Sequence, residues 1–99
     1  MTVYWTRNAK LALRAVHDYV ARNSPRYAQG LVDRITRKTE LLNQFPELGG
    51  EVPEYENESI RELVEYPYRI IYRVREDRVE ILSVVHGARP LPPEVPGDA

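Results

Sequence analysis

Apolar positions recur at helical spacing through the first part of the chain. Between residues 7 and 22 they fall three or four residues apart, at Ala9, Leu13, Val16 and Val20, which places them along one face of a helix. Ser24 followed by Pro25 is a favoured start for a second helix. Its apolar stripe consists of Ala28, Leu31, Val32, Ile35, Thr39 and Leu42. This helix must end by residue 45, because Pro46 disfavours a helical residue before it, so the sequence predicts a helical hairpin.

The last third of the chain has the composition of strands instead. Residues 60–66, 68–74 and 78–86 are rich in β-branched and aromatic side chains, and they are separated by Pro67 and by the turn-forming pair Glu76-Asp77. These runs are expected to be antiparallel neighbours. A short run at residues 2–6 also suits a strand, with Thr6 able to cap the first helix.

Side-chain alternation divides the middle run into two faces. Tyr68, Ile70, Tyr72 and Val74 share one face, and Arg69, Ile71 and Arg73 share the other. We expect the first set to pack against the helices. The predicted fold class is therefore α+β, with an N-terminal helical hairpin packed on a small twisted antiparallel β-sheet.

Two segments lack any such period. Gly49-Gly50, Pro53 and the acidic residues between 51 and 58 predict a polar, mobile loop. The stretch 90–99 holds four of the eight prolines and is expected to be an extended appendage. We predict one domain over residues 1–92, followed by a flexible Pro-rich tail at 93–99, with no internal repeat or domain linker.

Composition narrows the functional classes. The chain has 99 residues, no cysteine and a net charge of −1, so disulfides and thiolate metal sites are excluded and there is no long-range attraction to nucleic acid or to anionic membranes. No apolar run could span a bilayer and no signal peptide opens the chain, which predicts a cytoplasmic protein without a membrane partner. Any binding of nucleic acid must use a local patch, such as the arginines Arg61, Arg69, Arg73, Arg75, Arg78 and Arg89.

Arg69, His86 and Arg89 are the candidate site residues. Arg69 lies mid-strand on the face turned away from the helices, where arginine either pairs with a glutamate over the sheet or forms a fork for phosphate or carboxylate. His86 ends the last strand before Gly87, with Arg89 close by. A histidine that exchanges protons and an arginine that stabilises phosphate charge are competent for RNA cleavage. They are equally competent to form a strand-end hydrogen bond.

Metal and nucleotide sites have little support in the sequence. His17 falls opposite much of the first apolar stripe and is interpreted as a surface residue. No histidine pair has a metal-binding spacing, and the carboxylates do not form a calcium loop, so neither a metal nor another cofactor is expected. Gly49-Gly50 lacks the strand, glycine fingerprint and helix of a phosphate-binding loop, so it is interpreted as a turn.

The order of these elements resembles the RelE/ParE superfamily, the toxins of type II toxin–antitoxin systems. The resemblance extends from Val3 to about Pro92, and its most specific segments are WTRNA at Trp5 to Ala9, NSP at Asn23 to Pro25, FPELGG at Phe45 to Gly50, IREL at Ile60 to Leu63, YRIIYRV and VVHGAR. It implies a helical hairpin on a twisted antiparallel sheet. It also implies a cognate antitoxin that wraps the toxin in a hetero-oligomer.

The superfamily divides by target. Resemblance to RelE-like members implies cleavage of messenger RNA at the ribosome, with residues like Arg69 and Arg89 in a basic cleft, but Ile60 and Glu62 stand where such nucleases carry basic residues and no tyrosine follows Arg89. Other ribonuclease branches pair a glutamate base with a histidine acid, for which Glu54 and His86 are the nearest matches. The near-neutral charge, Glu62 and the HGAR ending resemble the ParE-like branch more, and that branch implies inhibition of DNA gyrase without nuclease chemistry.

Overall fold

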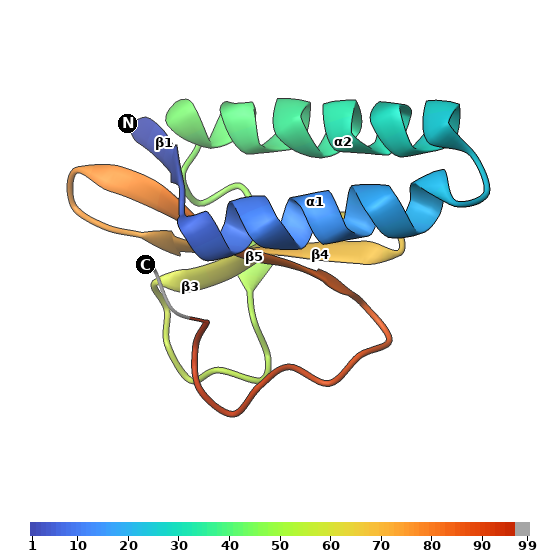
Figure 1. The fold of residues 1–99 in the computed structure, drawn as a ribbon. Helices are drawn as coiled ribbons and strands as arrows, with labels where there is room; N and C mark the ends of the chain where they lie inside the picture. The colour runs from blue at the N-terminus through green and yellow to red at the C-terminus, as the bar shows by residue number, and fades with distance from the viewer. Residues whose placement is uncertain (97–99) are drawn as a thin grey trace.

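Two helices lie across one face of a five-stranded sheet, and two irregular segments lie beneath the opposite face (Figure 1). The computed structural model describes residues 1–96. Its elements follow in the order β1 (Thr2–Trp5), α1 (Arg7–Ala21), α2 (Pro25–Glu40), a 3-10 turn (Leu41–Asn43), β2 (Gly50–Glu51), β3 (Ile60–Glu65), β4 (Tyr68–Val74) and β5 (Arg78–His86). The predicted fold class is confirmed.

Both helices begin at the residues that the sequence indicates. The Thr6 hydroxyl accepts a hydrogen bond from the backbone N–H of Ala9 at 3.1 Å, and the Ser24 hydroxyl accepts one from the N–H of Tyr27 at 3.1 Å. Each bond satisfies one of the backbone donors that a helix start leaves unpaired. Pro25 occupies the first turn of α2, where its missing N–H costs no hydrogen bond.

The sheet is mixed, which corrects the expectation of a purely antiparallel one. Its strand order is β1-β5-β4-β3-β2. The pairs β2–β3, β3–β4 and β4–β5 are antiparallel, whereas β1 runs parallel to β5, with Thr2 beside Arg78 and Trp5 beside Ile81. Alternation along β1 predicts a strand but carries no information on its direction, because parallel and antiparallel edges alternate alike.

The helix-covered face holds the main core, and the face assignment of β4 is confirmed. Tyr68, Ile70 and Tyr72 pack there against the helical stripes, and Val74 joins them at the margin. Ile70 and Tyr72 have no exposed surface. The buried members of this cluster are Ala9, Leu31, Ile35, Leu42, Leu63, Tyr68, Ile70, Tyr72, Val79, Ile81 and Val84.

A second apolar cluster covers the opposite face, which we call the outer face. It consists of Val52, Tyr55, Ile60, Ile71 and Leu82, with Val85, Leu91 and Val95 packed against it. The prediction of a polar, mobile loop is therefore wrong for Val52 and Tyr55, both of which are buried. Two apolar side chains among many glutamates are enough to fix the loop, because Ile71 and Leu82 offer them a dry surface.

The C-terminal segment follows the same face. The Tyr55 hydroxyl lies 2.9 Å from the carbonyl oxygen of Pro92 and 3.3 Å from that of Glu94, and Val95 packs against the second cluster. The chain up to Val95 thus lies on the sheet. The boundary at residue 92 and the flexibility of 93–99 stay predictions, and residues 97–99 lie outside the described part of the chain.

The FPELGG and WTRNA segments are both attached to the sheet by hydrogen bonds. Tyr72 donates its hydroxyl to the carbonyl of Pro46 and accepts from the N–H of Gly49, each at 2.9 Å. A Cβ at Gly49 would collide with the carbonyl oxygen of Glu62, so the FPELGG segment needs glycine there. Asn8 donates to the carbonyl of Leu82 at 2.8 Å, at the point where β5 bulges between the partners of Ile71 and Tyr72.

Candidate functional site

Arg69 lies at the centre of a carboxylate cluster on the outer face. Its Nε is 2.6 Å from Glu62 Oε1, and its Nη2 is 3.2 Å from Glu62 Oε2. The same guanidinium donates to both carboxylate oxygens of Glu54, at 2.7 and 2.9 Å. Arg69 is thus forked on two carboxylates at once, the geometry in which arginine ion pairs are strongest. The sequence leaves two roles open for Arg69, pairing with a glutamate or forming a fork for phosphate or carboxylate. The structure shows Arg69 paired with glutamates.

The ionisation of the cluster follows from this pairing. Hydrogen bonds from Arg69 lower the pKa of Glu54 from its usual value of 4.5 to about 2. The hydrogen bonds that Arg69 donates to Glu54 and then to Glu62 raise the pKa of Arg69 above its ordinary value. Glu54 and Arg69 are therefore charged at neutral pH, and the side chain of Arg69 is only 14% exposed.

Three other arginines in or beside the strands also form side-chain hydrogen bonds. Arg61 donates to the carbonyl of Gly49 at 2.6 Å. Arg75 and Arg78 both donate to the buried carboxylate of Glu80, at 2.7 and 3.0 Å. Burial acts to raise the pKa of Glu80, but the hydrogen bonds from these two arginines prevail and hold it below its ordinary value. Three of the six arginines that the sequence singled out, Arg69, Arg75 and Arg78, are therefore paired with carboxylates within the domain.

His86 occupies the end of β5 on the helix-covered side. It is paired with Tyr68 across the sheet, and the two rings meet edge to face with centroids 5.5 Å apart. Its Nδ1 accepts a hydrogen bond from the backbone N–H of Ala88 at 3.1 Å. Gly87 donates to the carbonyl of Pro67 at 2.7 Å, and Arg89 donates its backbone N–H to the carbonyl of His86 at 3.0 Å. These bonds shape the HGAR turn.

The candidate residues do not converge on one site. Arg69 is paired with Val85 and His86 with Tyr68, so their side chains leave opposite faces of the sheet. Glu54 lies with Arg69 on the outer face. Arg89 is exposed beyond the end of β5. The structure therefore joins Arg69 to Glu54 and places His86 near Arg89, and it separates these two pairs.

Some of the side chains in these clusters were not among the sequence candidates. In the sequence, Glu62 stands out only because it occupies a position where RelE-like nucleases carry a basic residue. In the structure it is the second carboxylate that pairs with Arg69. Its place opposite Ile71 in β3 puts it diagonal to Arg69 on one face, a signal that becomes legible once the strand register is known.

The described residues contain neither a membrane-spanning helix nor a metal-binding cluster. No helix within residues 1–96 is long and apolar enough to cross a membrane. Across the same residues, no three His, Cys, Asp or Glu side chains are grouped so that they could hold a metal ion.

The helical hairpin over this sheet is the architecture of the RelE/ParE superfamily of type II toxins. The family model described as the ParE toxin of the type II toxin–antitoxin system, parDE, matches residues 3–91. The chain therefore belongs to the ParE toxin family, and it is the toxin component of such a system, with a cognate antitoxin as its partner.

Two curated relatives agree with this assignment. Toxin RelE2 of Caulobacter vibrioides is 35% identical over 88 residues, which cover 88% of this chain and 96% of the relative. Putative toxin Y4kP of Sinorhizobium fredii is 34% identical over 94 residues, which cover 91% of this chain and 92% of the relative. The similarity thus spans nearly the whole length of each protein.

Two solved structures share the fold. A chain of the chromosomal ParDE toxin–antitoxin system from P. aeruginosa matches with a TM-score of 0.71 and 29% identity, over 87% of this chain and 95% of that one. A chain of the RelBE2 toxin–antitoxin complex from Mycobacterium tuberculosis matches with a TM-score of 0.58 and 22% identity, over 89% and 92%. The second match shows the fold alone.

Proposed function

We propose that this toxin inhibits DNA gyrase in the cytoplasm by binding it, without catalysis or a cofactor, and that its antitoxin holds it in an inactive hetero-oligomer. The observation that carries the proposal is the state of Arg69. Its guanidinium donates four hydrogen bonds to Glu54 and Glu62, so four of its five N–H groups are already occupied. Two carboxylates beside it also repel a polyanion.

The glutamate and histidine that could form a ribonuclease pair support the same proposal. A general base works best with a pKa near the operating pH, whereas hydrogen bonds from Arg69 lower the pKa of Glu54 to about 2. Glu54 also lies on the outer face with Arg69, while His86 lies beside Tyr68 on the other. One substrate phosphate could not contact both groups.

A supercoiling assay tests the proposal. Purified gyrase, relaxed plasmid and ATP are combined with increasing toxin, and we expect supercoiling to stop and to return when the cognate antitoxin is added in equal amount. His86→Ala is the matched control, because a histidine that only shapes a turn is dispensable for a binding inhibitor. We expect this variant to inhibit as the wild type does.

The alternative is a RelE-like, ribosome-dependent messenger RNA endoribonuclease. The name of the relative Toxin RelE2 and the partly exposed ring of His86 near Arg89 favour it. Ribosomes stalled on a defined message are therefore included in the same experiment. Cleavage of that message by the wild type, its loss in His86→Ala or Arg69→Ala, and undisturbed supercoiling would establish the endoribonuclease and exclude the gyrase inhibitor.

A further inference from the structure

Charge is divided between the two layers of the molecule. Residues 1–45, which form β1, both helices and the 3-10 turn, carry eight Lys or Arg and three Asp or Glu. Residues 46–99 carry six and twelve. The helical layer is therefore strongly basic, although the whole chain has a net charge of −1. A separation of this size creates a local field that the overall charge conceals.

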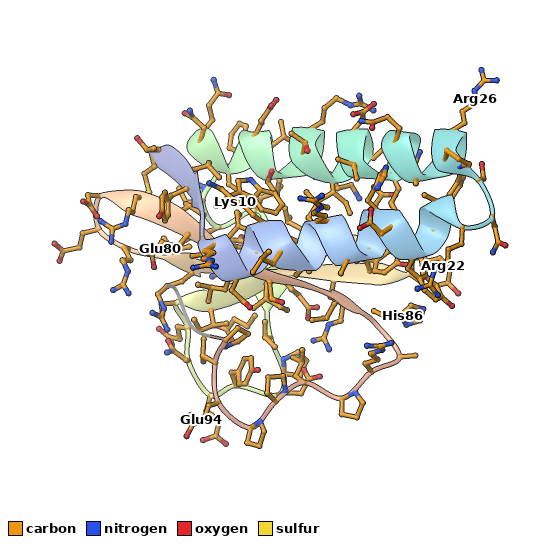
Figure 2. The ribbon with its side chains drawn as sticks, in the orientation of Figure 1. Lys10, Arg22, Arg26, Glu80, His86 and Glu94 are labelled. Atoms are coloured by element: carbon orange, nitrogen blue, oxygen red, sulfur yellow. The ribbon has the colours of Figure 1, made fainter. Side chains whose placement is uncertain are left out.

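The basic layer has one end where arginines and tyrosines gather. Figure 2 shows Arg22, Arg26 and His86 at the end where the two helices join. We call this the hairpin-end surface, and its members are Tyr19, Arg22, Arg26, Tyr27, Tyr66 and Arg89. Burial, then the neighbouring Tyr19 and Tyr27, raise the pKa of Tyr68, while Arg89 acts in the opposite direction. Tyr19 in α1, Tyr27 in α2 and Arg89 after β5 thus all interact electrostatically with Tyr68.

The tyrosines of this surface face solvent and order the arginines beside them. Tyr66, Tyr19 and Tyr27 are 85%, 64% and 52% exposed. The guanidinium of Arg22 lies 5.6 Å from the ring centroid of Tyr19, and that of Arg34 lies 5.5 Å from the ring of Tyr27. Such stacking holds the guanidinium of Arg22 in place while its N–H donors stay available, whereas Arg34 also pairs with Glu65.

The cations at this end lack the carboxylate partners that Arg69, Arg75 and Arg78 have. Within residues 1–96, no ion pair or side-chain hydrogen bond involves Arg22, Arg26 or Arg89. Arg69 and Arg78, by contrast, each have two acidic partners. Unpaired guanidinium groups beside exposed aromatic rings are the composition of a protein-binding hot spot.

We propose that the hairpin-end surface docks an acidic segment of the toxin's protein target. The three unpaired arginines supply its charge complementarity, and the tyrosines supply contact area around them. The inference rests on the proposed function, since it takes gyrase as the target.

The opposite end of the domain has a different surface chemistry. A groove of about 510 Å³ is lined there by Met1, Gln44, Phe45, Pro46, Glu47, Leu48 and Val74. Phe45 and Leu48 are exposed apolar side chains, of the kind that tight complexes bury. The hairpin-end surface offers charge instead, so its loss should affect encounter with an acidic target and spare neutralisation by the antitoxin.

Charge reversal tests the proposal. The variant Arg22→Glu/Arg26→Glu/Arg89→Glu alters the hairpin-end surface, and Arg7→Glu/Lys10→Glu/Arg37→Glu makes the same charge change on exposed residues elsewhere in the same helices. Gyrase supercoiling and antitoxin affinity are measured for both, with urea midpoints to verify folding. We expect the first variant to need about tenfold or more toxin for half inhibition. The control variant should stay within about twofold of the wild type, and both should bind antitoxin normally.

Any other result would contradict the proposal in a specific way. Equal loss of gyrase inhibition in both variants would mean that net charge alone causes the effect. Unchanged inhibition by the first variant would mean that the hairpin-end surface does not bind the target. Loss of antitoxin affinity alone would assign the surface to the antitoxin. Binding of a single-stranded oligonucleotide that the first variant abolishes would replace the acidic segment by nucleic acid. If the wild type does not inhibit gyrase, the proposed function fails first, and this inference with it.

Discussion

The two faces of the sheet are covered by different kinds of structure. Helices α1 and α2 cover one face with regular apolar stripes, whereas the outer face is covered by a loop that contributes Val52 and Tyr55 and by a C-terminal segment that contributes Leu91 and Val95. The two layers are equally dry at their centres, since Ile70 and Ile71 have no exposed surface. Burial alone therefore does not reveal which cover is held more firmly.

The largest expected effect comes from two neighbouring isoleucines. Ile70 packs in the helix-covered cluster and Ile71 in the outer one. Ile70→Ala is expected to lower the free energy of unfolding by about 4 kcal/mol, because close-packed helices collapse poorly onto a cavity. Ile71→Ala should cost about 2 to 3 kcal/mol, because a loop adjusts more readily. Urea denaturation of the two variants measures the difference.

Conservative changes at the same positions control for this comparison. Ile70→Val and Ile71→Val each remove one methylene and are expected to cost about 1 kcal/mol or less. If Ile71→Ala destabilises the domain as much as Ile70→Ala, the loop and the C-terminal segment are as rigid as the helices. The contrast between the two faces would then be one of shape only.

The next effect concerns the ion cluster of the outer face. Arg69→Met removes the guanidinium and leaves Glu62 and Glu54 facing each other without a cation. We expect a loss of about 2 kcal/mol, between the values for exposed and for fully buried pairs, because the side chains of Arg69 and Glu62 are about 15% exposed. The double variant Arg69→Met/Glu62→Gln should recover part of it. Additive losses in this cycle would mean that the two groups do not interact.

A smaller effect is expected where the C-terminal segment is attached. Tyr55→Phe keeps the ring in the outer cluster and removes the hydroxyl that bonds the carbonyls of Pro92 and Glu94. Such a bond contributes about 1 kcal/mol. Hydrogen exchange should therefore quicken around Val95 with little change at Ile70, and equal exchange in both proteins would show that apolar packing alone holds the segment.

The difference between the faces also explains what the sequence could predict. The helical period, the caps Thr6 and Ser24 and the inward face of β4 are local patterns, and they identify the hairpin and the main core. Val52 and Tyr55 stand among acidic residues without a period, so only the strand register shows that they meet Ile71. The geometry of the candidate site could not be predicted for the same reason. Arg69 and His86 are both on strands, but the face that each side chain occupies follows from pairing between distant segments. The same pairing places Glu62 diagonal to Arg69.

The smallest expected effect is a pH dependence of the free energy of unfolding that arises from Glu54 on the outer face. Arg69 lowers the pKa of this carboxyl from 4.5 to about 2, so its ionised form is the one that the fold stabilises. That stabilisation is fully present above about pH 5 and is lost as the pH falls through the folded value toward 2. Because the side chain of Glu54 is 42% exposed, solvent screening limits the contribution to about 1 kcal/mol or less. Glu54→Gln should therefore narrow the gap to the wild type between pH 5 and pH 2, measured by urea midpoints, whereas a constant gap would mean that Arg69 holds Glu62 alone.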